Sequence, residues 1–255
     1  MSKIEDITRP QWRFVADEAE LRERAAPLLG LGLVSVDTET YWDRAAGGGA
    51  RVSLVQVAAP EGEVLVADVL TTGVEPLREL VESPSVQMVA HNARFDEGVL
   101  RGAGLDPRGF LDTLQMARMT LRLRSYSLAA VTEHLFGLPL DKTLRTSNWR
   151  RRPLTRAQIE YAAKDARVTL KVFEELSRRL AEEGRLEMAL RLSEIRPPSG
   201  ERKPRKKRGV TTPAIALTPE EKRVVTRLKK WRLERAFQQR VPAYMICPDR
   251  TLEHL

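Results

Sequence analysis

The stretch from Leu33 to Glu39 constrains the fold most, because a β-branched apolar run leads directly into two carboxylates. Side chains alternate between the two faces of a strand, so Asp37 and Glu39 point to the same side. Two adjacent anions repel each other unless a cation lies between them or one is protonated. Hard divalent cations such as Mg²⁺ and Mn²⁺ prefer carboxylate oxygens. An isolated Asp-x-Glu is more often a strand that ends in solvated acids, so a metal site needs further acids elsewhere in the chain.

The chain has 255 residues, of which 42% are hydrophobic, and this suits one domain of average to large size with a small appendage. No apolar run approaches the roughly 20 residues of a membrane span. The N-terminus lacks the apolar region of a signal peptide. The single cysteine, Cys247, excludes an intramolecular disulfide and a cysteine-based metal site. We therefore expect a cytoplasmic protein, monomeric and without a membrane partner.

The formal net charge of +8 is concentrated in one segment. Residues 196–209 hold seven basic residues and one acid, a net +6. The rest of the chain is nearly balanced. A segment rich in Pro, Lys and Arg cannot form a core, so we expect a basic linker over residues 193–214.

The pattern of apolar residues predicts a mixed sheet. Three strands joined by short turns open it in antiparallel fashion, at Leu33–Glu39, Arg51–Val57 and Glu63–Ala67. From Glu75 onward helices alternate with strands, which indicates parallel crossovers. A long helix is predicted from Thr155 to about Leu180, and another over residues 217–239, where Thr218 and Glu221 form a capping box.

Two further acids follow other elements. Asp96 begins a helix just past a predicted strand end, where ligand sites of open α/β sheets collect. Tyr161 and Asp165 are four residues apart, so they lie on one face of the long helix. Taken alone, each motif is more often a packed aromatic or a solvated acid.

Together, the motifs resemble those of the DEDD superfamily of 3′–5′ exonucleases. Its three motifs occur here in order, as Asp37-Thr38-Glu39, as Asn92 followed by Phe95-Asp96, and as Tyr161-Ala162-Ala163-Lys164-Asp165. The tyrosine in the third motif marks the DEDDy branch. The region from Leu140 to Asp165, with Trp149-Arg150-Arg151-Arg152-Pro153-Leu154, is similar to ribonuclease D.

Two departures from the family pattern occur. Asn148 stands where ribonuclease D commonly has Asp, and the second motif looks more like the proofreading and Werner-type exonucleases. Beyond the linker, the residues from Leu228 to Leu252 are similar to the opening of an HRDC domain. We therefore expect an exonuclease domain over residues 1–192, the linker, and a partial HRDC-like helical segment over residues 215–255.

The resemblance implies an α/β, ribonuclease H-like fold, a mixed five-stranded sheet with helices on both faces. It implies two divalent cations, Mg²⁺ or Mn²⁺, held by Asp37, Glu39, Asp96 and Asp165, with Tyr161 orienting the attacking water. Basic side chains with an interleaved aromatic suit a single strand. The expected substrate contacts are Thr38, His91, Asn92, Lys142, Trp149, Arg150, Arg151 and Arg152.

The implied activity is release of 5′-nucleotide monophosphates from RNA 3′ ends, in the manner of ribonuclease D acting on tRNA precursors. Two alternatives remain open from the sequence. One is a DNA 3′–5′ exonuclease of the proofreading or Werner type, which shares every expected metal ligand. The other is a nucleic-acid-binding remnant without turnover, against which the intact set of acids counts. No motif encodes the 2′-hydroxyl contacts that separate RNA from DNA.

Overall fold

The structure is a computed structural model, and it describes residues 7–43, 48–195 and 218–239. The chain divides into two units, Met1–Ser199 and Gly200–Leu255, and each is considered by itself. The predicted linker lies almost entirely outside the described residues, as do most residues of the expected HRDC-like segment after the helix.

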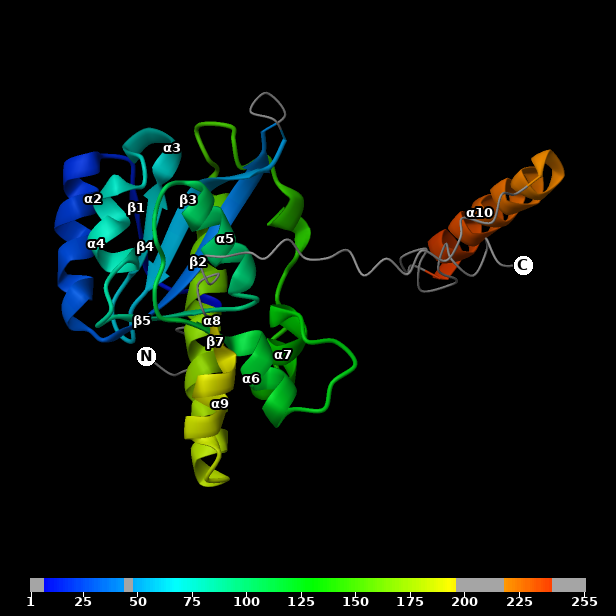
Figure 1. The fold of residues 1–255 in the computed structure, drawn as a ribbon. Helices are drawn as coiled ribbons and strands as arrows, with labels where there is room; N and C mark the ends of the chain where they lie inside the picture. The colour runs from blue at the N-terminus through cyan, green and yellow to red at the C-terminus, as the bar shows by residue number, and fades with distance from the viewer. Residues whose placement is uncertain (1–6, 44–47, 196–217, 240–255) are drawn as a thin grey trace, which may run out of the picture. The chain divides into compact units, whose positions relative to one another are not determined.

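The first unit is built on one seven-stranded sheet in the order β1-β4-β3-β2-β5-β6-β7 (Figure 1). The pairs β2–β3, β3–β4 and β6–β7 are antiparallel, whereas β1–β4, β2–β5 and β5–β6 are parallel. The strands are β1 (Trp12–Val15), β2 (Leu33–Trp42), β3 (Ala50–Ala58), β4 (Val64–Asp68), β5 (Gln87–Ala90), β6 (Phe110–Asp112) and β7 (Glu194–Ile195).

Helices cover both faces of this sheet, and each face has its own apolar core. One core joins the sheet to α6 (Thr113–Thr120), α7 (Leu128–Phe136), α8 (Arg156–Glu182) and α9 (Leu186–Ser193). The other joins it to α2 (Glu18–Ala25), α4 (Arg78–Val81) and α5 (Arg94–Gly102). The remaining short helices are η1 (Ala26–Gly30), α3 (Val69–Thr72), η2 (Glu75–Leu77) and η3 (Thr143–Thr146).

The mixed α/β architecture agrees with the sequence prediction, but the strand number does not. The sheet has seven strands instead of five, because β1 pairs in parallel with β4 and the two-residue β7 pairs with β6. The folded part also continues past the expected boundary at residue 192, since Ser193 closes α9 and β7 follows it. The sequence does predict a short aromatic-containing strand at the start of residues 11–29, which is β1, whereas the two residues of β7 are too few for an alternating pattern to be recognised.

The strand that opens the acidic motif is longer than predicted. It runs on to Trp42, with a bulge between Glu39 and Thr40, so Asp37 and Glu39 lie in the middle of β2 and not at its end. Both acids therefore lie within the sheet and not at its edge.

The long helix begins as predicted. Thr155 caps α8, and its side chain and that of Gln158 form a reciprocal capping box. In the second unit, Thr218 and Glu221 form the same arrangement ahead of α10 (Pro219–Gln239). Among the described helices, none is both long enough and apolar enough to cross a membrane.

Candidate active site

The acids of β2 face the long helix. Ser35 lies on the same strand face as Asp37 and Glu39, and its hydroxyl donates to the carbonyl of Ala166 on α8 at 2.6 Å. This bond fixes α8 against the odd-numbered face of β2. Asp165, the residue before Ala166, is thereby brought to the same side of the sheet as the two acids of the strand.

Asp96 approaches from the opposite layer. It lies in the first turn of α5 and is 3% exposed. Thr38, between the two acids of β2, points to that layer, and its hydroxyl donates to Oδ1 of Asp96 at 2.7 Å. The three sequence motifs thus meet at the middle of β2, one from each side of the sheet and one on the strand itself.

Burial and mutual repulsion perturb all four acids. Desolvation, followed by the charges of Asp96, Asp165 and Glu39, raises the pKa of Asp37 well above its ordinary value. Desolvation and the charges of Asp165 and Asp96 raise the pKa of Glu39 to about 9. Burial also raises the pKa of Asp96 to about 7 and that of Asp165 to about 6, partly opposed by hydrogen bonds from Thr38 and Tyr161.

No arginine or lysine in the described part of the chain forms an ion pair with these four acids. Four carboxylates, of which Asp96 is buried and the other three are half-buried, have no basic ion-pair partner there and form a donor set that suits hard divalent cations. In the same described residues, however, no group of three or more Asp, Glu, His or Cys side chains is already drawn together as a metal site. The acids are near enough to repel each other, and the chain's own groups do not neutralise them.

Tyr161 is held between the acids and a buried ring. Its hydroxyl is hydrogen-bonded to Asp165, and its ring lies 6.1 Å from that of Trp149, between centroids, at an interplanar angle of 34°. Desolvation, then the charge of Asp165 and the hydrogen bond to it, raises the pKa of Tyr161 above its ordinary value. The phenol therefore remains protonated at neutral pH and acts here as a donor.

A clamp of three residues, Arg152, Asp68 and Ser53, fixes Trp149. Arg152 makes a bidentate ion pair with buried Asp68 of β4, with Nε–Oδ2 and Nη2–Oδ1 both at 2.6 Å. The same guanidinium donates to the carbonyl of Trp149 at 2.8 Å, and Ser53 of β3 donates to that carbonyl at 2.5 Å. The segment before α8 is thereby tied to the sheet beneath Tyr161.

The comparisons with known proteins agree with this geometry. The family model described as "3′-5′ exonuclease" matches residues 12–181. Ribonuclease D of Xanthomonas oryzae pv. oryzae is 32% identical over 257 residues, which are 96% of this chain and 67% of that protein. The chain belongs to the ribonuclease D-like 3′–5′ exonucleases.

Other relatives of this exonuclease family extend the comparison. Ribonuclease D of Nitrobacter hamburgensis is 36% identical over 181 residues, 68% of this chain and 45% of that protein. The chain thus spans about half to two thirds of the length of these relatives. The crystal structure of Escherichia coli RNase D has the same fold, with a TM-score of 0.63 and 23% identity over 95% of this chain and 65% of that one. The HRDC domain model matches residues 221–255, as the sequence predicted.

Half of the expected substrate contacts are engaged within the protein. Thr38 is buried against Asp96, Trp149 is 2% exposed beneath Tyr161, and Arg152 belongs to the clamp. The ring nitrogens of His91 lie 2.9 Å from Thr113 Oγ1 and 2.8 Å from the carbonyl of Tyr126, and burial lowers its pKa. Each of these four side chains is held by contacts within the protein, and the expectation that they also reach substrate stays a prediction.

The other half are exposed at the surface, namely Asn92, Lys142, Arg150 and Arg151. Arg150 stacks over the ring of Tyr41 at 5.2 Å, and Asn92 adopts a left-handed backbone with φ of 67°. Sequence reasoning missed Phe95, which is 47% exposed next to Asp96, and Gln56, which is buried directly opposite Asp37 in the β2–β3 register. The signal available for Phe95 was an aromatic residue next to a motif acid. The signal available for Gln56 was a polar amide among the apolar residues at the end of β3.

Proposed function

We propose that this chain is a metal-dependent 3′–5′ exoribonuclease of the ribonuclease D type, which releases 5′-nucleotide monophosphates from RNA 3′ ends. The observation that carries the proposal is the set of four buried or half-buried acids, which lie on three elements, raise one another's pKa and have no ion-pair partner among the described residues. The relatives named ribonuclease D support RNA as the substrate. That tRNA precursors are the natural RNA is implied only by the resemblance of the sequence motifs.

In this proposal Asp37, Glu39, Asp96 and Asp165 hold two Mg²⁺ or Mn²⁺ ions. When bound, the ions supply activation of water and stabilisation of charge on the scissile phosphate and leaving oxygen. Thr38 fixes the carboxylate of Asp96 by its 2.7 Å hydrogen bond. Tyr161 orients the water through its hydroxyl, because a phenol with a raised pKa is a poor base at neutral pH.

The exposed residues on the loop before α8 provide the contacts to a single strand. Lys142, Arg145, Arg150 and Arg151 are exposed there and suit phosphate groups. The ring of Phe95, which is 47% exposed beside Asp96, suits stacking with the terminal base. These contacts replace the expected role of Trp149, whose ring is buried.

The test is hydrolysis of matched RNA and DNA oligonucleotides with free or blocked 3′ ends, in Mg²⁺ and in Mn²⁺. Asp96→Asn removes one charge but retains an oxygen that accepts the bond from Thr38, so it should fold normally. We expect it to lose at least about 100-fold in rate and to bind Mn²⁺ more weakly. Tyr161→Phe should slow the chemical step by roughly 10²–10⁴-fold with Mn²⁺ affinity unchanged.

The matched control is Glu97→Gln. Glu97 is the next residue on α5 and equally buried, but it is paired with Arg101 at 2.9 Å and lies outside the acidic set. It should retain activity. If Asp96→Asn turned over within a few-fold of the parent, or if a blocked 3′ end were cut equally well, the proposed function would be wrong. Preference for DNA would reassign the substrate and leave the site intact.

A further inference from the structure

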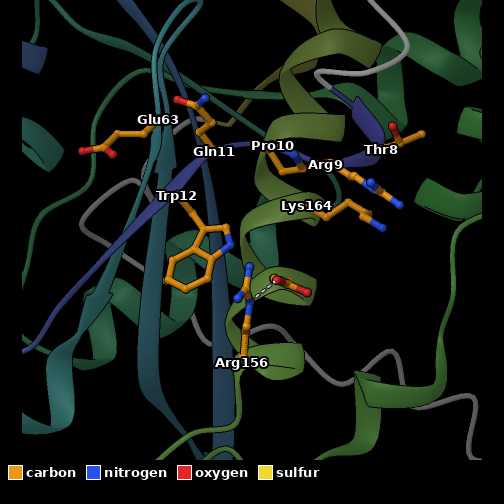
Figure 2. A pocket seen from close by; sticks show the side chains of 9 residues that line it. Thr8, Arg9, Pro10, Gln11, Trp12, Glu63, Arg156 and Lys164 are labelled. Carbon is orange, nitrogen blue, oxygen red and sulfur yellow. Dashed lines mark hydrogen bonds and ion pairs between the residues drawn. The ribbon is translucent and has the colours of Figure 1, made fainter.

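A second concave site lies on the other flank of the catalytic helix. A cavity of about 730 Å³ opens between the segment leading into β1 and the first turns of α8 (Figure 2). Arg9, Trp12, Glu63, Arg156, Glu160 and Lys164 are among the residues that line it. In Figure 2 the indole of Trp12 lies near the end of the Arg156 side chain, whereas the side chains of Arg9 and Lys164 extend from neighbouring backbone segments, away from the indole.

The charges of this cavity do not balance. Glu160 is paired with Arg156 at 2.7 Å, and Glu63 with Arg24 at 3.1 Å. Arg9 and Lys164 have no ion-pair partner among the described residues. Glu63 and Glu160 also line the cavity, but both are paired, so Arg9 and Lys164 leave it with a net positive charge that favours an anionic ligand, just as the four acids favour a cation.

The cavity also offers an aromatic surface beside these cations. Trp12 is half-buried, because one side of its ring packs against the core. An aromatic ring next to free cations is the combination that binds single-stranded nucleic acid, through base stacking and phosphate contacts. The ligand that fits both features is a nucleotide unit.

The geometry of α8 relates this cavity to the catalytic site. Arg156, Glu160 and Lys164 follow one another at intervals of four along the helix, and Tyr161 and Asp165 follow each of the last two by one residue. Consecutive residues of an α-helix point about 100° apart, so the cavity and the acids lie on different flanks. A helix with side chains is roughly 10–12 Å across. At about 3.4 Å per stacked nucleotide, a strand needs three to four nucleotides to cross it.

We propose that this cavity binds a nucleotide of the substrate strand several positions upstream of the reacting 3′ end, with its phosphate on Arg9 and Lys164 and its base on Trp12. The inference rests on the proposed function for the direction of the strand. It adds a contact that only substrates longer than about four nucleotides reach.

The test is binding of a 5′-fluorescein-labelled octamer of adenylate to the full chain, followed by fluorescence anisotropy in EDTA. Without metal there is no turnover, and the cavity needs no metal. The variants are Arg9→Ala and Trp12→Leu, and the matched control is Arg191→Ala, an exposed arginine on α9. Lys164 is left unchanged because its charge also acts on Asp165. Unlabelled octamer, dinucleotide and 5′-AMP serve as competitors.

We expect Arg9→Ala and Trp12→Leu to weaken octamer binding at least about fivefold, and the control less than twofold. Arg9→Ala should also lower the slope of log affinity against log salt by about 0.7, the value for one phosphate contact. Dinucleotide should not compete for the contact that depends on Arg9. Because Arg9 is exposed, its replacement leaves the fold intact even if Trp12→Leu destabilises it.

Equal octamer affinity for Arg9→Ala and Arg191→Ala would overturn the proposal. The proposal would also be overturned if 5′-AMP displaced the octamer from the parent chain but not from Arg9→Ala. The cavity would then bind the free mononucleotide and not a nucleotide within the strand. The outcome is independent of hydrolysis. A chain that binds the octamer as predicted but does not cleave RNA overturns the proposed function alone.

Discussion

At the scale of single residues, the acidic set is a destabilising arrangement that the fold maintains. Asp37 and Glu39 occupy the middle of a central strand, where burial opposes their ionisation. Thr38 donates to Asp96 from the intervening position, so a single strand both carries two acids and orients a third. Groups whose ionisation is opposed in the folded chain make its stability depend on pH and on cations.

We predict that the metal-free chain loses stability as pH rises from about 5 to 9. The pKa is raised to about 6 for Asp165, about 7 for Asp96 and about 9 for Glu39 in the folded chain. At a pH between the ordinary pKa of a carboxyl group and these values, the folded state binds more protons than the unfolded state. Stability therefore falls through this window. Because the pKa of His91 is lowered, this residue alone would make stability rise with pH below about pH 6.5. It is one group, whereas several acids act in the other direction.

Thermal unfolding followed by circular dichroism at each pH, with and without Mn²⁺, measures this effect. The cation should raise Tm far more at pH 8 than at pH 5. Asp96→Asn should flatten the pH dependence of the metal-free chain. A Tm that rises steadily from pH 5 to 9 without metal would contradict the perturbed pKa values.

Gln56 provides a second prediction at this scale. It is completely buried opposite Asp37, and neither Nε2 nor Oε1 has a hydrogen-bond partner among the described residues. Leaving a buried amide unpaired costs about 1–3 kcal/mol. Gln56→Leu, similar in volume, should therefore raise the free energy of unfolding by about 1 kcal/mol in urea titrations at fixed pH. A loss of stability instead would mean that the amide is paired in solution.

At the scale of elements, α8 supplies Tyr161 and Asp165 to the site and was the element best predicted. Thr155, the capping box and the apolar period are local signals, and they placed Tyr161 and Asp165 on one face. The clamp could not be predicted, because Asp68 and Arg152 are 84 residues apart and Asp68 belongs to no motif. Trp149 was expected at the surface for the same reason, since its burial depends on β3 and β4.

We predict that the clamp supports catalysis through Trp149. Arg152→Ala should lower the free energy of unfolding by about 3 kcal/mol, because it leaves Asp68 buried and unpaired. Arg152→Lys should not restore the parent, since an ammonium cannot reproduce the bidentate pair. Both should lower kcat on a saturating oligonucleotide, because the ring beneath Tyr161 loses its anchor.

The control is Arg151→Ala, the exposed neighbouring arginine, which should change stability by no more than about 0.5 kcal/mol. The near-ultraviolet circular dichroism of the folded variants reports the packing of Trp149. Unchanged spectra and kcat in Arg152→Lys would show that the pair is structural only.

At the scale of the whole molecule, the sequence predicted the mixed α/β architecture but not the full number of strands at the edges of the sheet. Alternating strands and helices predicted the mixed sheet, and the short strand β1 was predicted as well, but its pairing with β4 and the formation of β7 depend on distant strands. The distribution of charge is a separate property that the sequence alone defines. Of the net +8, the segment 196–209 holds +6, and it lies outside the described residues.

We predict that this segment supplies much of the salt-dependent affinity for nucleic acid. Replacing Lys206, Lys207 and Arg208 by Gln should lower the slope of log affinity against log salt by about 2, at 0.7 for each phosphate contact to a single strand. Turnover of a short substrate at saturation should not change, because the acids that perform the chemistry are untouched. The matched control neutralises Arg22, Arg108 and Arg191, three exposed arginines of the exonuclease unit, and should leave the slope near that of the parent. An equal loss of slope in both triple variants would mean that net charge alone attracts the strand, and that the position of the basic segment in the chain has no part in binding.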